Sequence, residues 1–505
     1  MKPDIKELYR LHRLTLDVRY VSTRGEGKKH SAAEVIKKGL ADDGGLFVPE
    51  RFFPLLTEDL VEELCGFDYA DRAAFILSRF LPDYKFADLL AAARTAYSAE
   101  KFGGPAAPVA RVGDEYLLEL WHGPTSAFKD MALQIMPRLL SLALDITGEC
   151  RDAYILVATS GDTGKAALEG YRDVPRVRIK VFYPVNGVSN IQKKQMSSQP
   201  GENVDVVAIN GNFDDAQTGV KKIFSDENCR LELARKGYFF SSANSINWGR
   251  LAPQIVYYIS AYCDLLKEKQ IKPGEKIDIV VPTGNFGNIF AAYAAKQMLL
   301  PVGRLVCASN RNDVLADFIN TGVYDKRREF FTTVSPSMDI LISSNLERLL
   351  YWKFGAQTTA GFMKELAENG VYRLNGEQLA SVQSDFCGFS CTEEETKAVI
   401  AETFAKYGYL CDTHTAVALG CAEKYRESAS YTGNRLLVAS TASPYKFAPA
   451  VLSALGESVP ADDFAALDKL HEVTKVPVPG NLAVLKDLPD RFTKIVEPEE
   501  MKETL

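Results

Sequence analysis

The chain contains no apolar run of the eighteen or so residues that a membrane-spanning helix requires, and no long run of lysine and arginine. Its 59 basic and 66 acidic residues give a formal net charge of −7. A mildly acidic chain without basic runs does not attract nucleic acid or anionic membranes, so we expect neither as a partner. The 505 residues are 46% hydrophobic, which predicts a globular protein of two or three domains.

Groupings of metal-binding residues are also scarce. The five histidines are dispersed, and the nine cysteines show no paired spacing; Cys387 and Cys391 are the closest two, with no histidine nearby. The sequence therefore predicts no metal site, and cysteines that are mostly buried in a reducing compartment. The first residues, Met1–Asp4, lack the apolar segment of a secretory signal, so we expect a cytoplasmic protein.

Two nucleotide-binding signatures are missing as well. The chain has neither the GxGxxG pattern of dinucleotide-binding folds nor the GxxxxGK[ST] pattern of nucleoside-triphosphate sites. Its glycine-containing turns therefore suit another kind of anionic ligand.

What the sequence does contain is the element order of an α/β fold. From Leu56 to about Tyr97, apolar residues recur at spacings of three and four, which predicts a mostly helical N-terminal domain. After about residue 100, short β-branched runs alternate with helical patterns, which is typical of open parallel sheets with helices on both faces. The predicted strands span residues 116–120, 153–158, 178–183, 204–209, 277–281, 304–308 and 436–439. Ligands of such sheets bind at the carboxyl ends of the strands. We expect residues 497–505 to be a charged, frayed tail.

The most informative stretch runs from Trp121 to Asp130. It follows a predicted strand and leads into a helical pattern over residues 131–144, so Lys129 is expected at a strand-turn-helix junction. The positive end of a helix dipole and apolar neighbours would both lower the pKa of its amine. A lysine that is neutral near pH 7 can form a Schiff base. A solvated lysine in the first turn of a surface helix is the alternative.

Three predicted strand ends carry residues suited to anions, and a fourth presents hydroxyl groups. The turn Thr159–Lys165 opens a helix with small hydroxyl residues and glycines, and Pro282–Asn288 does so with two glycines and two asparagines. The segment Ser241–Arg250 combines neutral hydrogen-bonding groups with one guanidinium, which could hold a phosphate. Ser440–Phe447 presents hydroxyl groups after an apolar strand. A capped helix start, a polar loop or an ST-turn would explain each of these segments singly.

Taken together, these segments resemble the motifs of the threonine synthase family, pyridoxal-phosphate enzymes with the tryptophan-synthase-β type of fold. The similarity extends to residues 20–24, 39–49, 335–340 and 412–416, and so spans nearly the whole chain. It matches the long form of the family, which has an extra N-terminal domain. The implied domains are an N-terminal domain (1–100), a large cofactor domain (101–130 and 250–490), a small cofactor domain (131–249) and a C-terminal tail (491–505).

The resemblance also implies roles for individual residues. Lys129 would be the catalytic residue, holding pyridoxal 5′-phosphate as a Schiff base and then shuttling protons. The loop of Gly284, Asn285, Phe286, Gly287 and Asn288 would bind the cofactor phosphate, Thr441 the pyridine nitrogen, and Asp162 would lie beside the phenolic oxygen. The substrate carboxylate would be bound by Ser160, Gly161 and Thr163, and the substrate phosphate by Asn244, Ser245 and Arg250.

The implied activity is that of a carbon-oxygen lyase acting on phosphates. O-phospho-L-homoserine and water would give L-threonine and phosphate by γ-elimination followed by β-addition of water, the last step of threonine biosynthesis. We expect a monomer or a homodimer. The chain departs from the family pattern at Ser443, where many family members have histidine.

Three alternatives stay open at this point. A serine or threonine dehydratase of the same fold would need no phosphate clamp at residues 244–250. A non-catalytic binding protein would be expected to lose Lys129 or the loops, which are present here. A relative acting on phosphoserine would keep a phosphate clamp at other distances.

Overall fold

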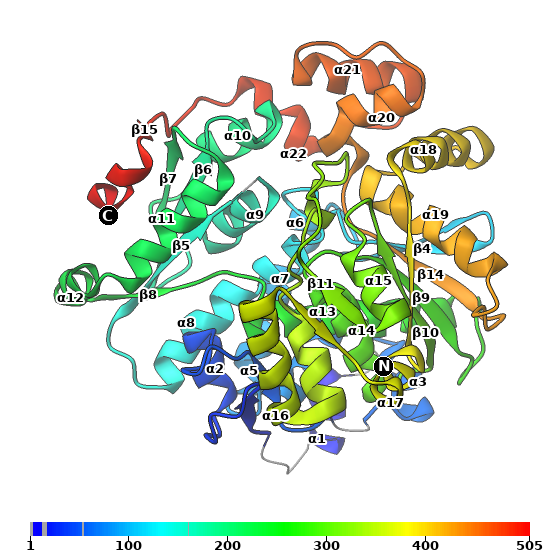
Figure 1. Ribbon diagram of the computed structural model, residues 1–505, viewed down its shortest axis with the longest axis horizontal. Coiled ribbons are helices and arrows are strands. Elements are labelled where there is room, and N and C mark those ends of the chain that lie inside the picture. Colours follow the sequence, from blue (N-terminus) through cyan, green and yellow to red (C-terminus); the bar gives the residue numbers. More distant parts are fainter. Residues whose placement is uncertain (1–3, 13–17, 53–54, 160) are drawn as a thin grey trace.

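The computed structural model describes residues 4–12, 18–52, 55–159 and 161–505. Figure 1 shows two separate open sheets, with helices around each of them and N-terminal helices packed below the larger sheet. The α/β architecture expected from the sequence is confirmed, with parallel sheets and a helical N-terminal region. Among the described residues, no helix is both long and apolar enough to cross a membrane.

The larger sheet has six strands in the order β13-β10-β9-β14-β4-β3. All neighbours pair in parallel except the β3–β4 hairpin. Alternate side chains of its strands pack on α13 and α14 on one face and on α19 on the other, so both faces are buried. The strands are β3 (Val109–Val112), β4 (Glu115–Glu119), β9 (Ile277–Pro282), β10 (Val302–Ser309), β13 (Phe386–Ser390) and β14 (Arg435–Ser440).

The helices around this sheet come mostly from the second half of the chain. They are α13 (Trp248–Lys267), α14 (Gly287–Gln297), α15 (Val314–Thr321), α16 (Leu346–Asn369), α17 (Gly376–Gln383), α18 (Glu393–Tyr407), α19 (Thr413–Glu427), α20 (Ala448–Ala454), α21 (Asp463–Thr474) and α22 (Gly480–Ala483). The 3₁₀ helices are η1 (Pro336–Met338), η2 (Pro444–Phe447) and η3 (Leu485–Asp487), and the hairpin of β11 (Val323–Asp325) and β12 (Val371–Arg373) lies apart from the sheet.

The smaller sheet has five parallel strands in the order β15-β7-β6-β5-β8. They are β5 (Asp152–Ala158), β6 (Val177–Pro184), β7 (Val204–Ile209), β8 (Tyr238–Ser241) and β15 (Ile495–Val496). The surrounding helices are α7 (Asp130–Leu133), α8 (Met136–Ile146), α9 (Asp162–Tyr171), α10 (Asn190–Ser197), α11 (Phe213–Ser225) and α12 (Glu227–Arg235).

The N-terminal region packs against α13, the long helix that leads back from the small sheet to the large one. Buried Arg72 pairs with Asp264 of α13 at 2.7 Å. Within the N-terminal region, Tyr20 donates a hydrogen bond to the carbonyl of Phe80 at 2.6 Å. Its elements are α1 (Ile5–Leu11), β1 (Tyr20–Ser22), α2 (Ala32–Lys38), β2 (Phe47–Pro49), α3 (Glu58–Leu64), α4 (Tyr69–Phe80), α5 (Phe86–Ala96) and α6 (Ala99–Phe102).

Two local expectations were wrong. The tail is not frayed: β15 pairs with β7, and the 3₁₀ helix η4 (Pro498–Thr504) buries Met501 to 1% exposure against α11. β15 has only two residues, too few to show an alternating pattern in the sequence. The helical pattern over residues 131–144 forms two helices, α7 and α8, with Pro137 in the first turn of the second. The domain boundaries stay a prediction.

Candidate active site

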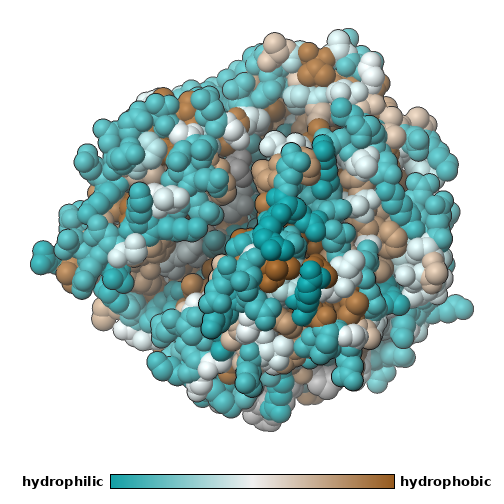
Figure 2. All heavy atoms as spheres, viewed as in Figure 1, coloured by the Kyte–Doolittle hydropathy of each residue, from teal (hydrophilic) through white to brown (hydrophobic). Residues whose placement is uncertain are grey.

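The predicted site segments lie at the carboxyl ends of strands from both sheets. Lys129 follows β4, Gly284–Asn288 follows β9 and Thr441 follows β14 in the large sheet, while Gly161–Thr163 follows β5 and Asn244 follows β8 in the small one. Figure 2 shows a recess on the viewed surface, between the lobe that contains the small sheet and the rest of the molecule. Parallel strands bring these loops together because their carboxyl ends share one edge of each sheet.

Lys129 directly precedes α7, and only 12% of its side chain is exposed. Its Nζ donates a hydrogen bond to Ser337 Oγ at 3.1 Å and lies 3.9 Å from Asp162 Oδ2. Burial lowers the pKa of Lys129, and the positive charges of Lys446 and Arg250 act in the same direction, against the effect of Asp162. The predicted direction of the shift is thus supported. Its main cause is burial; α7 has only four residues and a correspondingly weak dipole.

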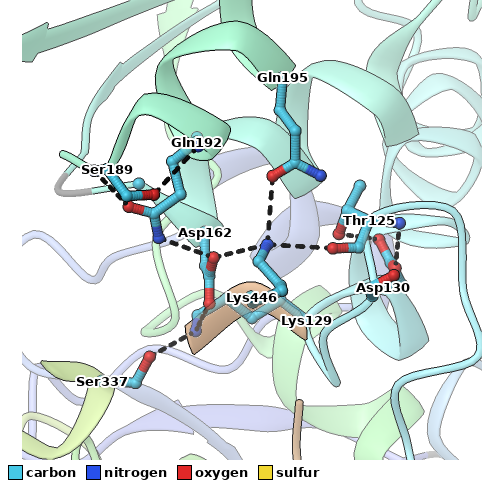
Figure 3. Close-up of polar contacts among 12 residues, drawn as sticks. Thr125, Lys129, Asp130, Asp162, Ser189, Gln192, Gln195, Ser337 and Lys446 are labelled. Carbon is cyan, nitrogen blue, oxygen red and sulfur yellow. Dashed lines mark hydrogen bonds and ion pairs between the residues drawn. The ribbon is translucent and has the colours of Figure 1, made fainter. Parts of the chain in front are cut away.

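Asp162 lies between two lysines, as Figure 3 shows. Its Oδ1 contacts Lys446 Nζ at 2.6 Å and accepts a hydrogen bond from Gln192 Nε2 at 3.0 Å. Burial opposes ionisation of this carboxyl, but the charges of Lys446 and Lys129 outweigh that effect and hold the pKa of Asp162 below its usual range. The site therefore contains a fixed carboxylate whose charge persists at neutral pH.

A second carboxyl, Asp130, supports the turn that carries Lys129. Its two oxygens accept hydrogen bonds from the backbone N–H and the hydroxyl of Thr125, each at 2.8 Å. Burial raises the pKa of Asp130 to about 7, in spite of these hydrogen bonds. The side chain is fully buried, so its role is to shape the turn.

The loop Gly284–Asn288 contains a strained backbone conformation. Phe286 has a φ of +62°, in the left-handed region that non-glycine residues seldom adopt. A Cβ at Gly284 would lie 2.5 Å from the carbonyl oxygen of Ser337, so only glycine fits there. The loop is tied down from outside: Asn345 donates to the carbonyl of Asn285 through its backbone N–H at 3.1 Å and through Nδ2 at 2.9 Å.

Asn288, in the first turn of α14, has a fixed amide. Its Oδ1 accepts hydrogen bonds from Tyr257 and Tyr258, at 2.6 and 2.5 Å, while its buried Nδ2 has no partner within the described residues. Because both tyrosines donate to Oδ1, the orientation of the amide is determined. An oriented and unpaired donor at a helix start is suited to a phosphate oxygen.

Of the predicted substrate-phosphate residues, Asn244 and Ser245 are accessible and Arg250 is 4% exposed. Ser245 donates to Asn244 Oδ1 at 3.2 Å, and Arg250 donates to the carbonyl of Ala243 at 2.6 Å. The Nε of Arg250 is buried without a partner among the described residues, and burial lowers the pKa of Arg250 to about 10. A buried guanidinium with an unused donor favours an anionic ligand.

The remaining predicted residues lie along the same edge. Gly161 has a φ of +138°, and its backbone N–H donates to Thr159 Oγ1 at 3.0 Å; Thr163 is half-buried in the first turn of α9. Ser160 lies outside the described residues. The carbonyl of Thr441 accepts a hydrogen bond from the backbone N–H of Phe128 at 2.8 Å, so this strand end is paired with the Lys129 turn.

Ser443, the departure noted above, is fully buried and structural here. Its backbone N–H donates to the carbonyl of Ser126 at 3.0 Å, and its Oγ accepts from the N–H of Tyr445 at 3.4 Å. Serine therefore caps η2, a task for which a hydroxyl suffices.

Four further residues contact this group and carried no predicted role: Gln192, Ser337, His414 and Lys446. His414 Nε2 accepts the backbone N–H of Ser337 at 3.1 Å, and its Nδ1 lies 2.7 Å from Asp412 Oδ2. His414 therefore positions the residue that accepts a hydrogen bond from Lys129. The family-like segments 335–340 and 412–416 were the only sequence signal for Ser337 and His414.

Three family models match the chain. They are described as threonine synthase N terminus (residues 19–97), pyridoxal-phosphate dependent enzyme (110–441) and threonine synthase, C-terminal (415–504).

Within the described part of the chain, no three or more His, Cys, Asp or Glu side chains form a group that could hold a metal.

Known proteins are similar over most of the chain. Threonine synthase-like 1 of Homo sapiens is 42% identical over 84% of this chain and 58% of its own length, so the chain spans about three fifths of that relative. Threonine synthase of Pseudomonas aeruginosa is 38% identical over 86% of this chain and 90% of its own. The crystal structure of threonine synthase from Brucella melitensis with bound pyridoxal phosphate matches with a TM-score of 0.86 and 37% identity, covering 96% of this chain and 98% of that one.

Proposed function

Because the chain belongs to the threonine synthase family of pyridoxal-phosphate dependent enzymes, we propose that it converts O-phospho-L-homoserine and water to L-threonine and phosphate. The observation that carries the proposal is a pair of buried donors without partners among the described residues, Asn288 Nδ2 and Arg250 Nε. They lie in the first turns of α14 and α13, directly after the two segments that would bind the two phosphate groups, one on the cofactor and one on the substrate.

The site fits pyridoxal 5′-phosphate. Lys129 offers a buried amine with a lowered pKa, and the loop Gly284–Asn288 offers backbone N–H groups and the Asn288 amide to a phosphate. Thr441 would place a neutral hydroxyl at the pyridine nitrogen, and Asp162 would lie beside the phenolic oxygen. When bound, the cofactor supplies an electron sink for the carbons next to the amino group of the substrate.

Lys129 Nζ would take and return protons at the substrate carbons. Its hydrogen bond to Ser337 Oγ, at 3.1 Å, fixes the direction of the amine. A proton carrier is most effective when its pKa lies near the working pH, and burial moves the amine of Lys129 toward that range.

Arg250, Asn244 and Ser245 would hold the phosphate that becomes the leaving group. The guanidinium is buried, so its charge is little screened by water and stabilises the negative charge that grows on the departing phosphate. Gly161, Thr163 and Ser160 would bind the substrate carboxylate at the start of α9. A dehydratase without a phosphorylated substrate would not need these three residues as a phosphate clamp.

The test is turnover of O-phospho-L-homoserine by the purified protein, with phosphate and threonine measured separately. We expect equal amounts of both products, and loss of turnover together with the visible cofactor band in Lys129→Ala. Arg250→Met should keep the band and lose activity toward the phosphorylated substrate. Activity toward serine or threonine, with none toward phosphohomoserine, would instead assign the chain to the dehydratases.

The proposal includes a cytoplasmic location and a small-molecule substrate as the main partner. All nine cysteines are unpaired, which suits a reducing compartment. We also propose the domain boundaries given above, near residues 100, 130, 250 and 490.

A further inference from the structure

A second buried lysine lies beside Lys129 and has no role in the reaction proposed above. Lys446 is in η2, after β14, and its side chain is 0% exposed. Its Nζ lies 2.6 Å from Asp162 Oδ1 and donates to the carbonyl of Thr125 at 3.0 Å and to Gln195 Oε1 at 3.3 Å, as Figure 3 shows. Each of the three hydrogens of a lysine ammonium therefore has an acceptor.

Asp162 is shared unequally between the two lysines. Its carboxylate is 2.6 Å from Lys446 Nζ but 3.9 Å from Lys129 Nζ, and Gln192 holds the oxygen that faces Lys446. A carboxylate and an ammonium left alone in a buried site would form a close ion pair. The closer pair here is with Lys446, so Lys129 has only a long contact to the carboxylate.

We propose that Lys446 is a positioning residue: it engages the Asp162 carboxylate and thereby leaves the amine of Lys129 free to carry protons. This inference rests on the proposed function, in which Lys129 is the proton carrier. Lys446 also ties the small-sheet unit, through Asp162 and Gln195, to the turn that carries Lys129, through the Thr125 carbonyl.

The charges around Lys129 all bear on this inference. Asp162 faces it from α9, Lys446 from η2, Arg250 from α13 and Asp130 from α7; the two carboxyls raise the pKa of Lys129, and burial and the two cations lower it. Loss of Lys446 would remove one repelling cation and release Asp162 to pair with Lys129. Both effects favour the charged form of Lys129, so they cannot cancel.

The measurement is the pH dependence of Lys129 acetylation in the 505-residue chain freed of cofactor. Acetic anhydride reacts with neutral amines, so the rate at each lysine, measured by mass spectrometry, follows its unprotonated fraction. In Lys446→Met we expect the midpoint of Lys129 to rise by about one pH unit, which makes its acetylation near pH 7 about tenfold slower. Lys446→Arg keeps the charge and should restore most of the wild-type rate.

Two further variants separate this effect from damage to the fold. Asp162→Asn removes the counter-charge and should lower the Lys129 midpoint, whereas unfolding would raise it. Lys353→Met removes another buried lysine, which pairs with Asp385 at 2.9 Å, and should leave the Lys129 midpoint unchanged. Lys180, 2% exposed in β6, should stay protected in every folded variant.

An unchanged Lys129 midpoint in Lys446→Met, or a midpoint that rises equally in Lys446→Arg, would overturn the inference. The acetylation profile needs no substrate, so it can fail while wild-type turnover of phosphohomoserine succeeds. If the wild type does not turn over phosphohomoserine, the proposed function is contradicted, whatever the acetylation profile shows.

Discussion

Arg348 donates a hydrogen bond from Nε to the carbonyl oxygen of Phe47 at 2.9 Å. Its guanidinium is fully buried on α16, and its other nitrogens donate to Asn345 Oδ1 and, at 2.5 Å, to the carbonyl of Ile246. One side chain thus links β2 of the N-terminal region to both proposed phosphate loops, because Asn345 holds the carbonyl of Asn285. The N-terminal region therefore helps to set the distance between the two anion-binding loops.

Arg348→Lys should weaken this link without removing the charge. Lysine cannot reach three diverging acceptors, so we expect the free energy of unfolding to fall by about 2–3 kcal/mol. The KM for O-phospho-L-homoserine should rise roughly tenfold as the loop at Ile246 loosens. Chemical unfolding and steady-state kinetics measure both effects. Arg327→Lys, at an exposed ion pair with Asp325, is the matched control, and an unchanged KM in Arg348→Lys would contradict the link.

Asn288→Asp should weaken cofactor binding through the phosphate group alone. Aspartate keeps the acceptor used by Tyr257 and Tyr258 but puts a negative charge in place of the free Nδ2 donor. We expect the Kd for pyridoxal phosphate to rise by at least about tenfold in an absorbance titration. Pyridoxal, which lacks the phosphate, should bind equally to both proteins. Asn375→Asp, at the start of α17, controls for the charge change, and equal losses for both aldehydes would argue against a phosphate contact at Asn288.

Asp130→Asn should flatten the pH dependence of stability. Burial raises the pKa of Asp130 to about 7, so the folded state holds this proton more tightly than the unfolded state. The resulting stabilisation is present below about pH 4 and is lost as the pH rises to about 7, by about 1.4 kcal/mol per pH unit. Urea unfolding between pH 5 and 7.5 should show this loss in the wild type and not in the variant.

The matched control for that titration is Asp468→Asn, which changes an exposed carboxyl on α21. It should follow the wild-type curve. If Asp130→Asn follows that curve as well, Asp130 is ionised in the folded state at pH 5.

Met501→Ala should destabilise the small-sheet unit. Met501 is 1% exposed against α11, where a Cβ at Gly219 would lie 2.3 Å from its sulfur. Truncation of a buried methionine costs about 2–5 kcal/mol, and hydrogen exchange should quicken in β7 and α11. Leu488→Ala, at a partly exposed leucine, should change little. Equal stability of the two variants would show that η4 is docked only loosely.

The sequence predicted site residues best where they lie in one contiguous segment of the chain. The Trp121–Asp130 turn and the Gly284–Asn288 loop could be predicted because strand, turn and helix start follow one another. The family resemblance then supplied the cofactor and the fold, which the comparisons confirm.

Contacts between distant segments could not be predicted in the same way. Lys446 contacts Thr125 and Gln195, which are 321 and 251 residues away in the sequence. Hydrophobic periodicity does not predict contacts between segments so far apart. β15 was missed because its two residues form a strand only through pairing with β7. The lowered pKa of Lys129 was expected from the helix start and from apolar neighbours; its largest cause is burial, and the extent of burial depends on tertiary packing.

The position of β14 in the large sheet bears on how the chain is made. β4 and β9 flank β14 and are joined through it, although β14 begins only at residue 435. During synthesis from the N-terminus, the β3–β4 hairpin must therefore wait, with one edge unpaired, until most of the chain has left the ribosome. Such late closure predicts slow folding and a need for protection of exposed strand edges in the nascent chain.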